Sequence, residues 1–201
     1  MSHNTWIHRA VRVAVRPLVA TRLTPNHVTA VRLATGIAAA GAFAQGDEAW
    51  RMWGAGIFLV SMFLDRADGE LARLSGKTSR RGHTYDLVGD ALSNALAFVG
   101  LGIGLPAGIF GSWAFPMGLV AGAAIAAILL LIVRLEALRG ARAGELAGFA
   151  GFDPDDAMLV VPVAVWLGGA DWLLLAAAVG APGFALLMLL KFRRGLRGAG
   201  S

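Results

Sequence analysis

Four aspartates stand at helical spacings within one short stretch of the chain. Asp65 and Asp68 are three residues apart, and Asp86 and Asp90 are four residues apart. Each pair shares a face if its segment is helical. A short connection would make the two segments antiparallel neighbours and bring the pairs together. Converging carboxylates repel one another and are costly to remove from water unless they are paired, so the pattern predicts a cation at this place.

Two sources of positive charge fit this pattern. Oxygen ligands without His or Cys favour Mg²⁺, Mn²⁺ or Ca²⁺ over zinc, and four carboxylates are enough for two divalent ions. A pair of ions suits the movement of a phosphoryl centre between oxygens. The alternative is a structural network in which neighbouring arginines neutralise the aspartates. Those arginines are Arg66, Arg73, Arg80 and Arg81.

Small residues accompany the aspartates. Gly69, Ala72 and Gly82 fall on the same faces, which leaves room for a ligand against the helix backbone. Arg73 can bind a phosphate through two hydrogen bonds. Metal ions, a phosphate-binding arginine and this space together favour a nucleoside-diphosphate substrate, although small residues alone also suit close helix packing.

The composition indicates a membrane protein. Of the 201 residues, 57% are hydrophobic and 15% charged, with a mean hydropathy of +0.65, whereas soluble domains average about 45–50% apolar and about 25% charged residues. We therefore expect an all-α polytopic membrane protein. The absence of cysteine excludes disulfides, thiolate metal sites and cysteine nucleophiles. The net charge of +5 comes with no compact basic domain, so no nucleic-acid partner is expected.

Six apolar stretches predict six transmembrane helices, since a span needs about 20 helical residues. They lie near residues 27–45, 52–73, 84–105, 113–134, 157–170 and 172–190. If both termini are cytoplasmic, 17 of the 18 Lys and Arg residues lie on the cytoplasmic side, all except Arg51. This predicts a protein of the inner (cytoplasmic) membrane, with the aspartates facing the cytoplasm.

The first 22 residues are expected to form a separate juxtamembrane segment, followed by one domain over residues 23–201. Arg9, Arg12 and Arg16 form one stripe of a helix, which predicts an amphipathic helix in the interface with its arginines towards anionic headgroups. The alternative is a disordered basic tail.

Residues 65–90 match the signature D-x2-D-G-x2-A-R-x8-G-x3-D-x3-D at all eight fixed positions. A chance match at a given start is on the order of 10⁻¹⁰ at average residue frequencies. The stretch resembles the CDP-alcohol phosphotransferase family. Residues 24–29 also resemble the P-N-x-x-T element at the start of the family's first helix. The plainer interpretation of that element is a helix N-terminus with Pro25 in its first turn and Asn26 as the cap.

The resemblance implies a transferase that joins a CDP-linked alcohol to an acceptor hydroxyl and releases CMP. Asp65, Asp68 and Asp86 would bind two divalent cations, Mg²⁺ or Mn²⁺. Asp90 would share in metal binding and take the proton of the acceptor. Family members are commonly homodimers, so a homodimer is expected. The residues near the CDP substrate would be Asn26, Thr29, Gly69, Ala72, Arg73 and Gly82.

The expected donor is CDP-diacylglycerol and the expected acceptor a small alcohol, in phospholipid biosynthesis. A soluble CDP-alcohol of the CDP-polyol or CDP-choline type is the alternative donor. A divalent-cation transporter is an alternative of another class, since acidic residues in membranes often mark ion pathways. Against it, the aspartates lie at helix ends and no second acidic layer completes a path.

Two departures from the family pattern bear on the acceptor. Arg81 stands where many members have an aromatic residue, and Leu87 stands where many glycerol-phosphate-using members have proline. Positive charge at Arg80 and Arg81 would suit a phosphorylated acceptor. The full set of candidate acceptor-phosphate residues is Arg80, Arg81, Arg134, Arg139 and Arg142. For the last three, charge that sets the membrane topology is the alternative.

Two further features are assigned structural roles. His83 lies in a cytoplasmic turn and is expected to be solvated rather than to act as a base. Three acidic residues precede the fifth apolar stretch and are expected to cap a helix N-terminus rather than form a second metal site. They are Asp153, Asp155 and Asp156.

Overall fold

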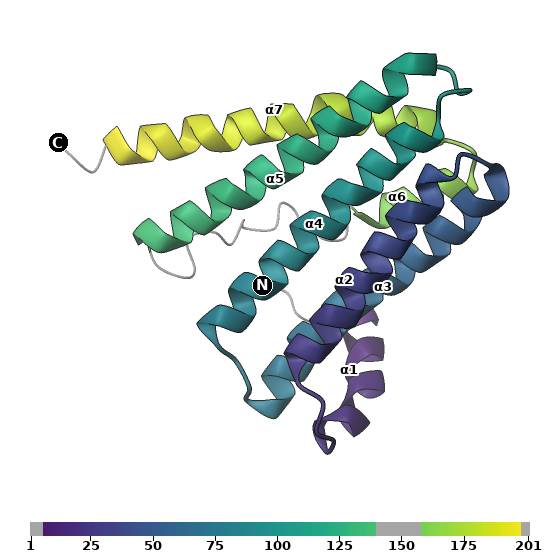
Figure 1. Cartoon of the computed structure of the whole chain (residues 1–201). Coiled ribbons are helices and arrows are strands. Elements are labelled where there is room, and N and C mark those ends of the chain that lie inside the picture. Colours follow the sequence, from purple (N-terminus) through teal and green to yellow (C-terminus); the bar gives the residue numbers. More distant parts are fainter. Residues whose placement is uncertain (1–5, 140–157, 198–201) are drawn as a thin grey trace.

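The computed structural model describes residues 6–139 and 158–197 (Figure 1). Within these ranges the regular structure is helical and contains no strand, which confirms the all-α fold. The elements are α1 (Trp6–Val19), α2 (Pro25–Ala44), α3 (Glu48–Ser75), α4 (Arg80–Gly104), the 3-10 helix η1 (Gly111–Trp113), α5 (Ala114–Arg139), α6 (Val160–Trp166) and α7 (Ala170–Arg197).

Four stretches are long and apolar enough to cross a membrane, which indicates an integral membrane protein. They are Pro25–Ala44, Arg80–Gly104, Gly111–Arg134 and Ala170–Leu190, and they correspond to the first, third, fourth and sixth expected spans. Of the other two, α3 is long enough but carries several charges in its second half, and α6 has only seven residues. Six spans and two cytoplasmic termini therefore stay predictions.

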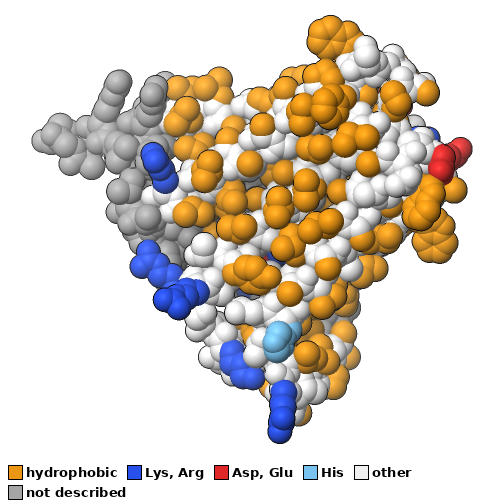
Figure 2. All heavy atoms as spheres, viewed as in Figure 1, with side chains coloured by type: hydrophobic (Ala, Val, Ile, Leu, Met, Phe, Trp, Pro, Cys, Tyr) orange, Lys and Arg blue, Asp and Glu red, His pale blue; other side chains and the backbone are white. Residues whose placement is uncertain are grey.

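The surface of the bundle divides by residue type. Apolar side chains cover the face shown in Figure 2, and Lys and Arg side chains gather along one edge. Trp53 and Trp113 are 70% and 71% exposed. Exposed aromatic rings of this kind suit the boundary between lipid and water.

Helix α2 begins with a capping box. The hydroxyl of Thr24 accepts a hydrogen bond from the backbone N–H of His27 at 3.4 Å, and His27 Nδ1 accepts one from the backbone N–H of Thr24 at 3.3 Å. Pro25 is the first helical residue, a position that needs no amide hydrogen. The sequence-based alternative with Asn26 as the cap is therefore wrong. Thr24 caps the helix, and the Asn26 side chain is available for contacts with α4.

Helix α2 packs along both α3 and α4, whereas α3 and α4 make few contacts with each other. The prediction that α3 and α4 are direct antiparallel neighbours is therefore wrong, although only residues 76–79 connect them. The α2–α4 contact is close because it is made through glycines. A Cβ atom on Gly100 would collide with the carbonyl of Ala40, and one on Gly104 with the carbonyl of Phe43. Small residues allow such backbone contact between membrane helices.

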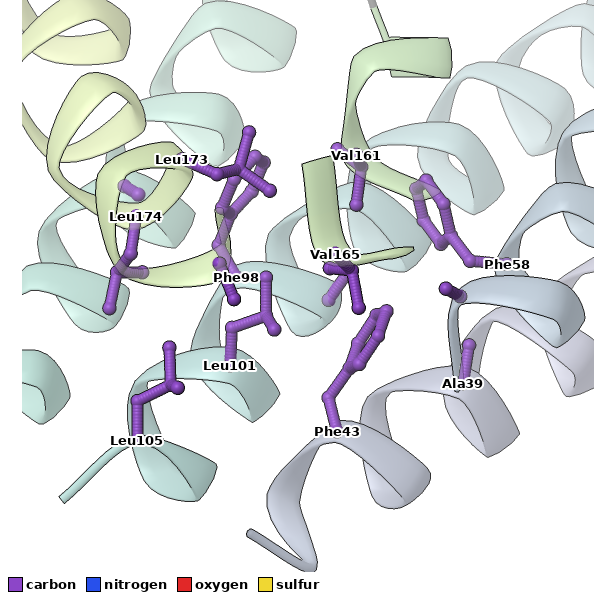
Figure 3. Close-up of a cluster of buried hydrophobic side chains, with 14 of the residues drawn as sticks. Ala39, Phe43, Phe58, Phe98, Leu101, Leu105, Val161, Val165, Leu173 and Leu174 are labelled. Carbon is purple, nitrogen blue, oxygen red and sulfur yellow. The ribbon is translucent and has the colours of Figure 1, made fainter. Parts of the chain in front are cut away.

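A buried apolar cluster holds together the C-terminal ends of α2 and α4 (Figure 3). Phe43 of α2, Phe58 of α3 and Leu101 of α4 are at most 1% exposed. Val165 of α6 and Leu174 of α7 complete the same cluster. Because α6 and α7 join α2, α3 and α4 here, this cluster fixes the relative positions of the helices that carry the site.

Helix α1 lies against α3. Val11 and Val15 are buried and belong to a second apolar cluster with Val28, Ala67 and Leu71. Arg12 forms an ion pair with Glu70 of α3. For Arg12, the expected orientation towards lipid headgroups is therefore wrong, because a buried carboxylate of the protein is its partner. The placement of α1 at the membrane interface stays a prediction.

Candidate active site

One face of α2 supplies three polar side chains to the site. Asn26, Thr29 and Arg32 are spaced three residues apart, so they lie along the same side of the helix. The buried hydroxyl of Thr29 donates a hydrogen bond to Asp68 Oδ2 at 2.7 Å. Thr29 therefore orients a signature carboxylate, and the short P-N-x-x-T element is connected to the long signature through this bond.

Arg32 joins the two halves of the signature. Its Nη1 atom lies 2.9 Å from Oδ1 of Asp65 and 2.9 Å from Oδ1 of Asp86, and its Nη2 atom lies 2.7 Å from Oδ1 of Asp90. The Arg32 side chain is only 2% exposed, so its buried charge is balanced by these carboxylates rather than by water. The two carboxylate pairs do converge, but α2 lies between the helices that carry them, and Arg32 of α2 contacts both pairs.

Sequence reasoning missed the role of Arg32. It counted Arg32 only among the basic residues that set the membrane topology. The available signal was a charged residue inside the first expected span, one turn beyond Thr29 on the same helix face. Ionisable residues inside membrane spans are rare and usually functional.

Three of the four aspartates form a group that fits a divalent cation. One carboxylate oxygen from each of Asp65, Asp68 and Asp86 lies within 4.8 Å of the other two. Asp68 Oδ1 is buried, and no hydrogen-bond partner for it exists among the described residues. A buried acceptor without a partner costs about 1–3 kcal/mol, and a cation would remove that cost. The all-oxygen set suits Mg²⁺ or Mn²⁺.

Asp90 shares the contact with Arg32 and has an additional donor, Asn94. Its Oδ1 atom accepts hydrogen bonds from Arg32 Nη2 at 2.7 Å and from Asn94 Nδ2 at 2.9 Å. These two donors fix the orientation of the carboxylate. The Asp90 side chain is nevertheless 39% exposed, so a molecule outside the bundle can reach it.

The residues expected near the CDP substrate lie near the N-terminal ends of α2 and α4 and the C-terminal end of α3, as the aspartates do. A Cβ atom on Gly82 would lie 3.3 Å from Asn26 Oδ1, so these two residues are neighbours. A Cβ atom on Gly69 would lie 3.9 Å from Arg73 Nη2, so the Arg73 guanidinium lies alongside that glycine. Ala72, which lies between Gly69 and Arg73 in the sequence, is half-buried.

The remaining candidates are placed only in part. Arg80 and Arg81 are exposed in the first turn of α4, and Arg134 is exposed near the end of α5. His83 is exposed, as expected of a solvated side chain. Outside the described residues or side chains lie Arg139, Arg142, Asp153, Asp155 and Asp156.

The family model of the CDP-alcohol phosphatidyltransferases matches residues 22–181 of the chain. The chain belongs to this family. A curated relative is the bifunctional IPC transferase and DIPP synthase of Rubrobacter xylanophilus, which is 31% identical over 181 residues. The alignment covers 89% of this chain and 39% of that protein, so the chain spans about two fifths of the relative's length.

The family match contains every residue of the carboxylate group and the α2 residues that contact it. CDP-alcohol phosphatidyltransferases transfer a substituted phosphate group. A convergent set of oxygen ligands beside an accessible carboxylate is suited to that class of reaction, because it can bind cations that neutralise a diphosphate.

Proposed function

We propose that this protein transfers a substituted phosphoryl group from a CDP-linked alcohol to the hydroxyl of a second alcohol, with release of CMP. The observation that carries the proposal is the group formed by Asp65, Asp68 and Asp86. Its oxygens converge, and one of them is buried with no hydrogen-bond partner among the described side chains. The family match over this region supports the same reaction class.

In this proposal Asp65, Asp68 and Asp86 hold the divalent cations, with Asp90 at their edge. Bound Mg²⁺ or Mn²⁺ supplies charge that neutralises the diphosphate and polarises the acceptor hydroxyl. Arg32 holds three of the carboxylates in a convergent arrangement, and Thr29 orients Asp68. In this arrangement α2 supplies a donor to each of the four carboxylates, and Asn94 of α4 supplies a second donor to Asp90.

Asp90 acts as the general base. The acceptor oxygen forms a bond to the phosphorus that carries the donated alcohol. The bond from that phosphorus to the bridging oxygen of CMP breaks, and its electron pair leaves with CMP. The acceptor proton moves to Asp90, whose carboxylate is held in place by Arg32 and Asn94. A positioned base contributes about 10²–10⁴-fold to such a reaction.

The proposed donor contacts use residues at the same end of the bundle. Arg73 binds the diphosphate beside Gly69, where a Cβ atom would meet only the Arg73 guanidinium within 4 Å, and the cytidine lies near Asn26 and Gly82. Thr29 follows Asn26 by three residues on α2, and Ala72 follows Gly69 by three residues on α3. Arg80 and Arg81 supply positive charge for a phosphorylated acceptor. Active protein is a homodimer, with its site open to the cytoplasm.

CDP-diacylglycerol is the proposed donor, because helices that cross a bilayer give a lipid substrate direct access to the site. The soluble-donor alternative is favoured by one observation. The curated relative is named an IPC transferase and DIPP synthase, and that name specifies no phosphatidyl group.

The deciding experiment uses purified protein in lipid nanodiscs with Mg²⁺. CMP release is measured with CDP-diacylglycerol and with soluble CDP-alcohols, each against phosphorylated and unphosphorylated acceptors. Release from the lipid donor alone supports a phosphatidyltransferase, and release from a soluble donor alone supports the alternative. No release from any donor, together with Mn²⁺ uptake by proteoliposomes, would favour the transporter. Mass spectrometry of lipid extracts after deletion and overexpression then identifies the product.

A further inference from the structure

Glu70 is a buried carboxylate that the proposed reaction does not use. It is 2% exposed and lies two residues beyond Asp68, which places it on a different face of α3. Each of its carboxylate oxygens has its own guanidinium. Arg12 Nε donates to Oε1, and Arg73 Nε donates to Oε2 at 3.1 Å.

The pair with Arg73 fixes the direction of that guanidinium. Arg73 Nη2 also lies 3.0 Å from Glu70 Oε2, so Glu70 occupies the Nε edge of the group. The outer edge, formed by Nη1 and Nη2, is the one that a phosphate would meet. The Arg73 side chain is 47% exposed and lies alongside Gly69. Glu70 thus holds Arg73 beside the face where the donor is proposed to bind.

Arg12 fixes the other side of Glu70 from a different helix. Val11 and Val15 are buried against the cluster that contains Ala67 and Leu71 of α3, so α1 is seated on α3 and Arg12 is held within reach of Glu70. Without Arg12, the buried Glu70 Oε1 atom loses its donor, at a cost of about 1–3 kcal/mol, and we expect the carboxylate to turn and to carry the Arg73 guanidinium with it. Removing Arg12 would therefore change the orientation of Arg73 without touching it.

We propose that Glu70 is a positioning residue for Arg73, and that Arg12 acts through Glu70 to make helix α1 part of the site that binds the donor diphosphate. The inference rests on the proposed function, because only a donor with a diphosphate gives Arg73 its ligand.

The test compares CDP with CMP as probes, because CMP lacks the second phosphate. Binding to full-length protein in nanodiscs with Mg²⁺ is measured by calorimetry for Glu70→Gln and Arg12→Gln. We expect affinity for CDP to fall about tenfold, as for one lost charge-assisted hydrogen bond, and affinity for CMP to fall much less. In turnover assays the donor KM should rise while kcat changes little. Arg12→Lys should restore most of the CDP affinity.

A double-mutant cycle separates positioning from a general effect of charge. In the Glu70→Gln background, Arg12→Gln should have no further effect on CDP affinity. Arg16→Gln, at an exposed position on the same helix, is the matched control and should bind CDP normally.

Three results would overturn the inference while leaving the proposed function intact: normal CDP affinity in Arg12→Gln, fully additive effects in the cycle, or equal losses for CDP and CMP. If the wild-type protein binds neither nucleotide, the proposed function fails and this inference fails with it. Arg12 is 41% exposed in its side chain, so Arg12→Gln keeps the test valid even if Glu70→Gln does not fold.

Discussion

Arg32 gives the carboxylate cluster a cation that belongs to the chain. It contacts Asp65, Asp86 and Asp90, whereas the Oδ1 atom of Asp68 lacks a hydrogen-bond partner among the described residues. One guanidinium cannot balance four carboxylates. The remaining negative charge is concentrated where oxygen ligands converge, which is the physical basis for expecting a divalent ion there.

The substitution Arg32→Gln tests this arrangement. Breaking a buried ion pair costs about 3–5 kcal/mol, so the thermal midpoint Tm should fall sharply in EDTA. Mg²⁺ should recover part of the loss, because a bound cation replaces some of the missing positive charge. The measurement is Tm in detergent with EDTA and with Mg²⁺, with Arg32→Lys as the control that keeps the charge. A fall in Tm that is the same with and without Mg²⁺ would contradict the expectation.

Asp90→Asn tests the base. The amide retains an oxygen that can accept hydrogen bonds from Arg32 and Asn94, so the local geometry should persist. We expect CMP release to fall at least about a hundredfold, the lower range for a positioned base. Affinity for the CDP substrate should fall much less, because the other three aspartates remain.

The outcome of Asp90→Asn is read from two measurements, turnover and calorimetric titration with the CDP substrate. If affinity falls as far as turnover, Asp90 is principally a metal ligand. Turnover close to that of the wild type would refute the assignment as a base.

At the scale of the helices, the sequence predicted which residues share a helix face better than it predicted which helices pack against each other. The spacing of the aspartates placed each pair on one helix face, since that depends only on helical periodicity. Which helix packs between them depends on glycines far from the signature, Gly100 and Gly104 among them, and on side-chain shape. The same limitation hid Arg32 and Glu70, because the partners of Arg32, and one of the two partners of Glu70, lie on other helices.

The α2–α4 contact leads to a prediction about packing. Gly100→Ala places a methyl group against the Ala40 carbonyl, and such overpacking typically costs about 1–3 kcal/mol. We expect a lower Tm and lower activity, because α2 would move away from α4 and take Arg32 with it. Gly41→Ala is the matched control, since a Cβ atom there meets nothing within 4 Å.

The Gly41→Ala protein should be at least as stable as the wild type, because alanine favours a helix by about 0.5–1 kcal/mol over glycine. Thermal unfolding and CMP release are measured for both variants. Equal stability of the two variants would mean that the α2–α4 distance has no effect on the fold.

For the whole molecule, composition was sufficient to predict the helical membrane class, but hydropathy was less informative about individual spans. Helix α3 carries Asp65, Asp68 and Glu70 because those side chains face protein partners, and this lowers its apolar character. Helix α6 is short, and Gly168 follows it with a positive φ of 73°. Apolar stretches therefore indicate candidate spans only where a helix stays nearly free of charged side chains over a membrane-crossing length.

Metal removal should affect activity and stability together. Because the carboxylate group fits a divalent ion, exhaustive EDTA treatment should abolish CMP release and lower Tm, and added Mg²⁺ or Mn²⁺ should restore both. Ca²⁺ serves as the comparison, since it also takes oxygen ligands but prefers longer bonds and more of them. Full activity after chelation would remove the metal from the proposed mechanism.

The absence of cysteine makes the orientation of the chain directly testable. Lys77→Cys lies between α3 and α4, and Ser112→Cys lies in η1; both positions are exposed. In intact spheroplasts a membrane-impermeant maleimide should label Ser112→Cys at once. Lys77→Cys should react only after permeabilisation, since its loop is expected to be cytoplasmic. The opposite pattern would place the carboxylate group outside the cell.

The location of Arg32 on α2 has a consequence for how the protein is made. α2 emerges from the ribosome before α3 and α4, so the guanidinium of Arg32 meets none of its aspartate partners until α3 follows with Asp65. A lone arginine in a nascent span opposes insertion into lipid, whereas a hairpin of α2 and α3 carries its own counter-charge. The two helices are therefore expected to enter the bilayer as a pair. α4 then adds Asp86 and Asp90, so the site is completed only when the third of these helices arrives.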